Sequence, residues 1–135
     1  LAVLAGAVRP AMVTALDTLK AKRFALGCIT NNVPSGQGAG MARSFAKAEE
    51  VAAIMARFDH VIESSKVGVR KPDPRIYQMM CDALAVAPAA CVYLDDLGIN
   101  CKPAAGLGMH AIKVTSGEQA LKELSQILDL ELSHP

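Results

Sequence analysis

Short apolar runs alternate with helix-forming segments along this chain of 135 residues, and no other feature constrains the fold as strongly. The apolar runs cover residues 24–29, 60–62, 91–94 and 109–114, and each is long enough for one buried strand. Helical spacing or helix-capping residues mark the segments 10–22, 46–58, 73–83, 100–107 and 118–128. Strands that alternate with helices form parallel sheets covered on both faces. The sequence therefore predicts an α/β fold, a three-layer Rossmann-like parallel sheet.

The composition excludes several classes of protein. Apolar residues make up 52% of the chain and charged residues 20%, which is too apolar for a disordered segment. The formal net charge is +1 and Trp is absent, so we expect no nucleic-acid partner and no membrane partner. The longest apolar run, residues 1–8, is too short to cross a bilayer. We interpret it as the end of an element that begins outside the chain.

The cysteines and histidines carry no metal-binding or disulfide pattern. The four cysteines show no Cys-x-x-Cys pair, which favours buried thiols over a disulfide framework or a zinc site; they are Cys28, Cys81, Cys91 and Cys101. Unpaired thiols indicate a reducing, cytoplasmic location. His60 and His110 lie on or beside predicted strands without a partner at ligand spacing, and we expect both to be structural.

Polar residues follow three of the predicted strands. The first strand ends in Thr-Asn-Asn at 30–32, the second leads to Lys71, and the third ends in Asp-Asp at 95–96. In open α/β sheets the ligand lies outside the carboxyl ends of the strands, so these groups should converge on one edge. A hydroxyl, amides, one cation and two carboxylates suit a phosphate together with a divalent cation.

Three motifs in chain order resemble the haloacid dehalogenase superfamily of hydrolases. They are Thr-Asn-Asn at 30–32, Gly-x-x-Lys-Pro-Asp-Pro-x-x-Tyr at 68–77, and Tyr-Leu-Asp-Asp-x-x-x-Asn at 93–100. The segment 94–104, with Gly-Met at 108–109, is similar to the phosphatase-like N-terminal domain of soluble epoxide hydrolases. A similar domain fused to some acyl-CoA dehydrogenases resembles it equally. The likeness runs from about residue 9 to about residue 130.

The resemblance implies roles for the residues that contact a phosphoryl group. Thr30 matches the hydroxyl that binds this group together with nearby backbone N–H groups. Asn31 follows it and would contact the substrate or phosphate. Lys71 matches the lysine that neutralises charge on the phosphoryl group and the nucleophile. Phosphoryl transfer develops negative charge on oxygen atoms, and fixed cations and donors stabilise that charge.

The resemblance also implies a Mg²⁺ cofactor. Asp96 matches the carboxylate that holds the metal, and Asp95 would support it directly or through water. Asn100 would support the same site.

The family's first motif, a strand ending in Asp-x-Asp with the nucleophile, has no counterpart here, because Asp17 in a helical segment is the only acid before Thr30. We expect the nucleophile strand and most of the cap to precede residue 1, so that residues 1–135 form the carboxyl-terminal part of a hydrolase core. That strand would lie centrally in the sheet. Without that strand the sheet would have a gap at its centre. We expect one of three outcomes: another chain fills the gap, the flanking strands pair directly, or the fragment is loosely folded and self-associates.

The leading functional hypothesis is a Mg²⁺-dependent phosphatase acting on a small phosphorylated or otherwise anionic substrate. Its aspartyl-phosphate would form on an Asp outside this chain, and the chain alone would be inactive. Two alternatives remain open: metal-free dehalogenation of haloacids, and a truncated or decayed module kept for binding or scaffolding. The glycines of segment 36–40 depart from nucleotide-binding spacing and indicate a loop.

Overall fold

The computed structural model describes residues 1–6, 12–31 and 52–130, which form a five-stranded sheet in the order β3-β2-β1-β4-β5. All four pairings are parallel, as predicted. The strands are β1 (Ala2–Ala5), β2 (Ala25–Thr30), β3 (His60–Glu63), β4 (Cys91–Asp95) and β5 (His110–Lys113). The helices are α1 (Val13–Ala21), α3 (Ser64–Val67), α4 (Pro74–Leu84), α5 (Gly98–Leu107) and α6 (Gly117–Leu128), with the 3-10 turn η3 (Pro88–Ala90). None of the helices in these ranges is long and apolar enough to span a membrane.

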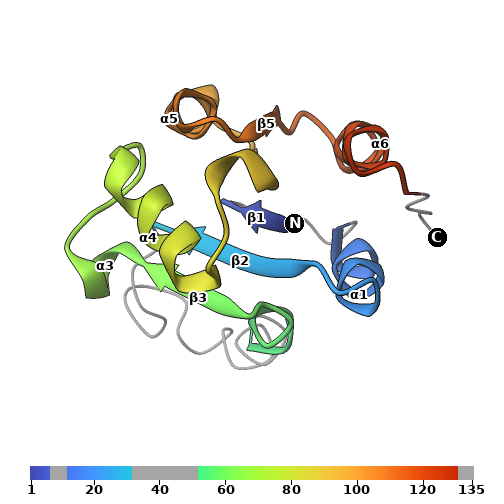
Figure 1. The fold of residues 1–135 in the computed structure, drawn as a ribbon, viewed down its shortest axis with the longest axis horizontal. Coiled ribbons are helices and arrows are strands. Elements are labelled where there is room, and N and C mark those ends of the chain that lie inside the picture. Colours follow the sequence, from blue (N-terminus) through green and yellow to red (C-terminus); the bar gives the residue numbers. More distant parts are fainter. Residues whose placement is uncertain (7–11, 32–51, 131–135) are drawn as a thin grey trace, which may run out of the picture.

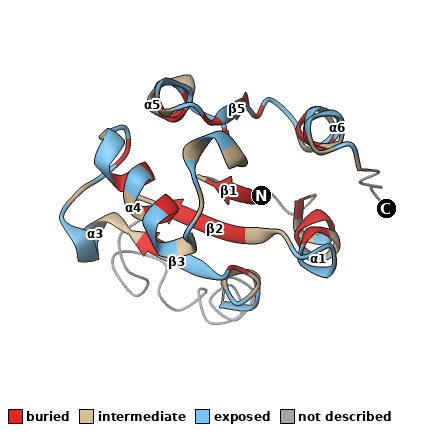
Figure 2. Ribbon diagram, in the orientation of Figure 1, coloured by how far each residue is buried: buried red, intermediate tan, exposed pale blue. Residues whose placement is uncertain are grey.

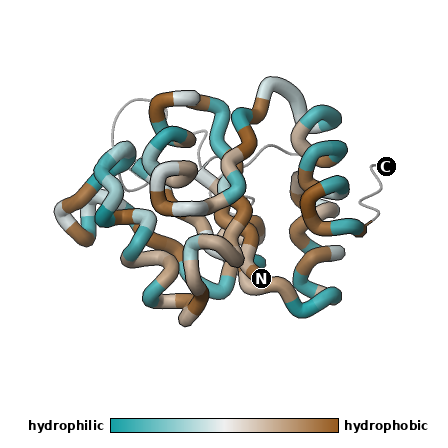
Figure 3. Tube along the Cα trace, turned by 45° about the horizontal axis from the view of Figure 1, so that its top comes forward, coloured by the Kyte–Doolittle hydropathy of each residue, from teal (hydrophilic) through white to brown (hydrophobic). Residues whose placement is uncertain are grey.

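Helices cover both faces of the sheet and complete the three layers (Figure 1). On one face α1 and α6 pack on the strands through residues such as Leu16 and Leu121. On the other face α4 and α5 contribute Met80 and Ala104 to a second apolar cluster. Hydrophobic and hydrophilic stretches alternate along the helical turns in Figure 3, because the helices that pack on the sheet bury one side only.

The strand β1 is the main correction to the expected sheet. Residues 1–8 are interpreted from the sequence as the end of an element from outside the chain, with a gap between β2 and β4. Instead Ala2–Ala5 fill that central position and pair with β2 on one side and β4 on the other. Each residue of β1 is at most 7% exposed, and Figure 2 shows the buried colour along β1 and the middle of β2. Neither another chain nor direct pairing of β2 with β4 closes the gap, because the chain fills it with its own residues.

Local signals set several helix ends as predicted. The carboxylate of Asp73 accepts a hydrogen bond from the backbone N–H of Arg75 and caps α4, which begins at Pro74. Gly108 ends α5 with a φ of 105°, a left-handed conformation that glycine adopts without strain. The segment 64–71, expected to be a plain connection, contains the short helix α3. Of the helix predicted over 46–58, residues 52–55 are helical and those before 52 lie outside the described residues.

The four cysteines are buried free thiols, as the sequence predicts. Burial raises the pKa of Cys28 to about 11 and that of Cys91 to about 12, so both stay protonated at neutral pH. The sulfur atoms of Cys81 and Cys91 lie 3.9 Å apart. Both residues belong to the apolar cluster under α4, where they act as small hydrophobic side chains.

Candidate active site at the carboxyl edge of the sheet

A buried ion pair between Lys71 and Asp95 forms the centre of the candidate site. The Lys71 Nζ atom lies 3.1 Å from Asp95 Oδ2, and the two side chains are 4% and 2% exposed. Asp95 is the last residue of β4, so the pair lies at the carboxyl edge of the sheet. The sequence predicts that these two residues meet at this edge, and the structure brings them into direct contact.

Asn31 holds the backbone of Lys71 from the end of β2. Its Oδ1 atom accepts a hydrogen bond of 3.0 Å from the Lys71 N–H, and its Nδ2 atom donates one of 3.1 Å to the Lys71 carbonyl. The pair of bonds spans 40 positions of sequence and fixes the loop before α4 against the sheet. In this structure Asn31 therefore positions Lys71, in addition to the substrate contact that the resemblance implies.

Four donors surround the Asp95 carboxylate. Its Oδ2 atom accepts from the Tyr93 hydroxyl at 2.7 Å, from Lys71 Nζ at 3.1 Å and from Asn100 Nδ2 at 3.2 Å. Its Oδ1 atom accepts from the Leu97 N–H at 3.0 Å. Burial acts to raise the pKa of this carboxyl, but the hydrogen bonds from Tyr93 and Leu97 and the charge of Lys71 outweigh it and hold the pKa below its usual value. Asp95 is therefore a fixed, buried anion.

Two tyrosines support this cluster. The Tyr77 hydroxyl donates a 2.6 Å hydrogen bond to the carbonyl of Asn100, and the Tyr77 and Tyr93 rings pack edge to face with centroids 5.1 Å apart. Burial, followed by the hydrogen bond to Asp95, raises the pKa of Tyr93, so its hydroxyl keeps its proton. Sequence reasoning assigns neither tyrosine a role. The signal for Tyr93 is its place two residues before Asp95, on the same face of a strand.

Gly6 completes the cluster from the end of the central strand. Its carbonyl accepts a 2.9 Å hydrogen bond from Lys71 Nζ, and its N–H donates a 2.8 Å bond to the Leu94 carbonyl. A Cβ atom at this position would lie 2.1 Å from Asp95 Oδ2 and 2.2 Å from the Tyr93 hydroxyl. Only glycine fits here while Asp95 keeps its present place, so β1 ends without room for a side chain.

The remaining predicted residues lie at the same edge with different exposure. Asp96 follows β4 and is exposed, and Thr30 is the half-buried last residue of β2. Asn100 is buried, and its Nδ2 atom donates a hydrogen bond to Asp95. Asn32 and the glycine-rich segment 36–40 lie outside the described residues. His60 and His110 begin β3 and β5, at the opposite edge of the sheet.

The donor set fits a divalent cation with one direct carboxylate ligand. Mg²⁺ commonly takes one or two carboxylates and fills its other positions with water and phosphate oxygens. Asp95 Oδ2 already accepts three hydrogen bonds, so Asp95 can offer only Oδ1, whereas no hydrogen bond to the Asp96 side chain occurs among the described residues. Within the same part of the chain no group of three or more acidic, His or Cys side chains could hold a metal alone. Asp96 is thus the residue that would hold Mg²⁺, with Asp95 behind it.

Comparisons with known proteins match most of the chain. A model of the haloacid dehalogenase-like hydrolases matches residues 1–108. Acyl-CoA dehydrogenase family member 10 of Mus musculus is 39% identical over 123 residues, which are 91% of this chain and 11% of that protein. Bifunctional epoxide hydrolase 2 of Sus scrofa is 38% identical over 121 residues, 90% of this chain and 21% of that protein. A phosphatase of Mycobacterium tuberculosis is 30% identical over 122 residues, 85% of this chain and 53% of the phosphatase. The chain therefore spans between about a tenth and a half of the length of these relatives.

Solved structures share the fold. An uncharacterized protein from Corynebacterium glutamicum aligns with a TM-score of 0.73 at 20% identity, over 97% of each chain. An enzyme of the same superfamily from Bacteroides thetaiotaomicron, in complex with magnesium and inorganic phosphate, aligns with a TM-score of 0.58 at 18% identity, over 82% of this chain and 55% of that one. At these identities the likeness concerns the fold, a Rossmann-like parallel sheet.

Proposed function

The chain belongs to the haloacid dehalogenase-like hydrolases, and from this premise we propose that its carboxyl-edge site is of the Mg²⁺-dependent phosphatase type. The observation that carries the proposal is the buried Lys71–Asp95 pair with the exposed Asp96 beside it. A fixed cation next to an exposed carboxylate suits a ligand that is itself an anion bound to a divalent cation. One relative, from Mycobacterium tuberculosis, is a phosphatase by name, which supports phosphate ester hydrolysis as the reaction class.

Lys71 would bind the phosphoryl oxygens. An ammonium group has three N–H donors, and Lys71 uses two of them for Gly6 and Asp95. The third is left for a phosphate oxygen. Asp95 fixes the side chain of Lys71, and Asn31 fixes its backbone. The ammonium group is therefore already in place when the phosphoryl group becomes more negative. Such preorganisation is the condition for electrostatic stabilisation of a transition state.

Thr30 and Asp96 would complete the binding of the phosphate. Thr30 ends the strand next to β1 and would contribute its hydroxyl, and Asp96 would hold Mg²⁺. The bound Mg²⁺ would polarise a phosphate oxygen and neutralise its charge. The substrate would be a small phosphorylated or otherwise anionic molecule.

The nucleophile in this proposal comes from a segment outside these 135 residues. The central strand is followed directly by Gly6, where a side chain would overlap Asp95 and Tyr93. A nucleophilic carboxylate at the centre of the sheet therefore needs either another strand in the place of β1 or a rearranged Asp95. We accordingly propose that the 135-residue chain alone has no phosphatase activity.

The test is the hydrolysis of p-nitrophenyl phosphate by a polypeptide that joins this chain to such a segment. We expect Mg²⁺-dependent turnover, reduced at least 100-fold in both Asp96→Asn and Lys71→Met, since one donor to a developing anion is worth about 10²–10³ in rate. Asp82→Asn removes an exposed carboxylate from α4 and should keep the wild-type rate. Unchanged rates in Asp96→Asn would overturn the metal assignment, and chloride release from a haloacid without Mg²⁺ would replace the phosphatase proposal with dehalogenation.

A second candidate is a non-catalytic module, and the same Gly6 observation favours it. In the described structure β1 occupies the central position and Lys71 is already neutralised by Asp95. If the joined polypeptide is well folded and still inactive, the module is the better description. Mg²⁺-dependent phosphate release from the 135-residue chain itself would contradict both the module and the need for an outside nucleophile.

A further inference from the structure

An open pocket of about 510 Å³ lies at the amino edge of the sheet, the edge opposite the candidate active site. It is lined by the first residues of β2 and β3, Ala25 and His60, and by the ends of α1 and α4. Ala25 in the pocket and Thr30 at the candidate active site are the first and last residues of β2, and they lie about 16 Å apart at about 3.3 Å per residue. Its volume is in the range of small-molecule sites, about 300–1,000 Å³.

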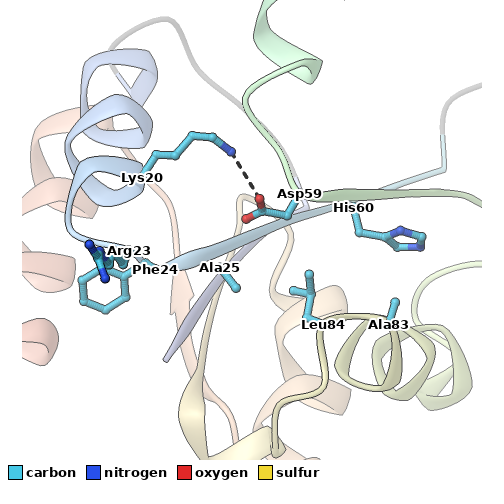
Figure 4. A pocket seen from close by; sticks show the side chains of 8 residues that line it. All are labelled: Lys20, Arg23, Phe24, Ala25, Asp59, His60, Ala83 and Leu84. Atoms are coloured by element: carbon cyan, nitrogen blue, oxygen red, sulfur yellow. Dashed lines mark hydrogen bonds and ion pairs between the residues drawn. The ribbon is translucent and has the colours of Figure 1, made fainter.

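The acidic residue of the pocket is neutralised within the protein. Asp59 Oδ1 accepts a hydrogen bond of 3.2 Å from Lys20 Nζ, drawn in Figure 4, and Asp59 Oδ2 accepts one of 2.8 Å from the Leu26 N–H. These bonds lower the pKa of Asp59, the backbone bond from Leu26 most and the bond and charge of Lys20 less, against the opposite effect of burial. Asp59 therefore stays ionised and bound, and it leaves no spare charge to repel an anion.

Arg23 supplies the excess positive charge. It is exposed, lines the pocket, and among the described residues its guanidinium makes no hydrogen bond or ion pair. It also has a φ of 67°, in the left-handed region that an arginine adopts only at a cost. Five N–H donors in a planar fork suit a carboxylate or phosphate. The imidazole of His60 offers a further polar group on the other side of the pocket (Figure 4).

The rest of the lining is apolar. Ala83 and Leu84 point from the end of α4 toward Ala25 and β3, as Figure 4 shows, and Phe24 lies beside Arg23. An apolar surface beside an unpaired guanidinium matches a ligand with an apolar body and an anionic head. A neutral apolar ligand would leave Arg23 unused, and a bare inorganic anion would leave the apolar lining uncovered.

We propose that this pocket is a binding site for a small organic anion, a carboxylate or phosphate monoester with a short apolar body. Arg23 binds the anionic group, and Ala83, Leu84 and Phe24 contact the apolar body. The site is separate from the one at the carboxyl edge and does not depend on Mg²⁺ or on the proposed phosphatase reaction.

The experiment is a titration of the ¹⁵N-labelled chain with phenyl phosphate and with benzoate, followed by the amide signals of Ala25, His60 and Leu84 in the absence of Mg²⁺. We expect saturable shifts of these signals with at least one of the two anions, and the difference between them tells a phosphate from a carboxylate preference. Arg23→Gln should weaken binding at least fivefold. The matched control Lys22→Gln removes the same charge from the neighbouring exposed residue, which does not line the pocket, and should change binding less than twofold.

A second variant and two further ligands keep the proposal falsifiable. Ala83→Leu fills the pocket without changing charge and should also weaken binding at least fivefold. Benzyl alcohol and benzylamine match the apolar body with a neutral or a cationic head, and both should bind more weakly than the anions. Equal affinities of Arg23→Gln and Lys22→Gln, tighter binding of benzylamine, or shifts confined to Thr30 and Lys71 would each overturn the proposal.

Discussion

Two lysine–aspartate pairs of nearly the same length lie at opposite edges of the sheet in the part of the chain that the structure describes. Lys71 and Asp95 at the carboxyl edge are 3.1 Å apart, and Lys20 and Asp59 at the amino edge are 3.2 Å apart. The first pair is 4% and 2% exposed, and the second is 47% and 42% exposed. The two distances are nearly equal, but the interaction energies of the two pairs should differ. Water and salt screen the exposed Lys20–Asp59 pair and do not reach the buried Lys71–Asp95 pair.

The difference lies in what each pair is attached to. Asp95 accepts three hydrogen bonds besides the one from Lys71, so removing one partner leaves a charge that the interior cannot solvate. Asp59 and Lys20 are both exposed to solvent, so water can replace a lost partner. The carboxyl edge is thus built to hold charges in fixed places, and the amino edge is built to leave them accessible.

The largest effect should come from breaking the buried pair. Lys71→Met leaves Asp95 buried without its cation and should lower the free energy of unfolding by about 3–5 kcal/mol. Urea denaturation followed by circular dichroism measures this change. Lys66→Met, at a lysine whose side chain is 70% exposed, is the control and should stay within about 0.5 kcal/mol of the wild type. A loss below 1 kcal/mol in Lys71→Met would show that the two pairs are energetically alike.

The next effect concerns the close approach of β1 to the buried pair. Gly6→Ala places a Cβ atom where Asp95 Oδ2 and the Tyr93 hydroxyl now lie, and should lower the free energy of unfolding by about 1–3 kcal/mol through overpacking. Gly106→Ala, in α5 with open space around the new Cβ atom, should leave stability unchanged or raise it by up to about 1 kcal/mol. Similar stabilities of the two variants would mean that β1 does not hold its described position.

Acid should weaken the carboxyl edge through Asp95. Its pKa is lower in the folded protein than in the unfolded chain, so it contributes stability above its ordinary pKa of about 3.9, and this contribution is lost as pH falls through the lower folded value. One carboxyl changes the free energy of unfolding by at most about 1.4 kcal/mol per pH unit. Urea unfolding between pH 6 and pH 2.5 should show a shallower dependence in Asp95→Asn than in the wild type. Parallel curves would exclude Asp95 as a source of the acid sensitivity.

The smallest effect should come from the exposed pair. Lys20→Met removes the partner of Asp59 and should lower the free energy of unfolding by only about 0.2–1 kcal/mol, because Asp59 keeps its bond to the Leu26 N–H and gains water. Added salt at 0.5 M should reduce even this difference, since the pair is screened. A loss comparable with that of Lys71→Met would contradict the role assigned to burial.

Much of the fold follows from short-range patterns. The strands that contain Leu26, Val61, Val92 and Ile112 could be predicted because each is an apolar run between turn or helix signals. The cap of α4 at Asp73 could be predicted because an Asp before a Pro is a local start signal. The meeting of Lys71 with Asp95 at one edge followed from the rule that parallel strands place their carboxyl ends together.

The central strand and the supporting side chains could not be predicted in the same way. Four apolar residues at the start of the chain carry no periodicity that tells a strand from the end of a helix, and β1 exists because β2 and β4 each offer it a row of backbone partners. Tyr93 reads in the sequence as one more core residue. Its hydroxyl becomes part of the site only because Asp95 lies on the same face of β4.

The sequence by itself thus determined the class of fold, the order of strands and helices along the chain, and which polar residues end the strands, because these depend on patterns within about ten residues. Only the tertiary structure decided which strand occupies the centre of the sheet and that Asp95 is buried while Asp96 is exposed. It also decided that the Lys71–Asp95 pair is buried and the Lys20–Asp59 pair is exposed. Burial and hydrogen-bond partners arise from segments as far apart as Gly6 and Lys71, separated by 65 positions, and no local pattern encodes such a contact.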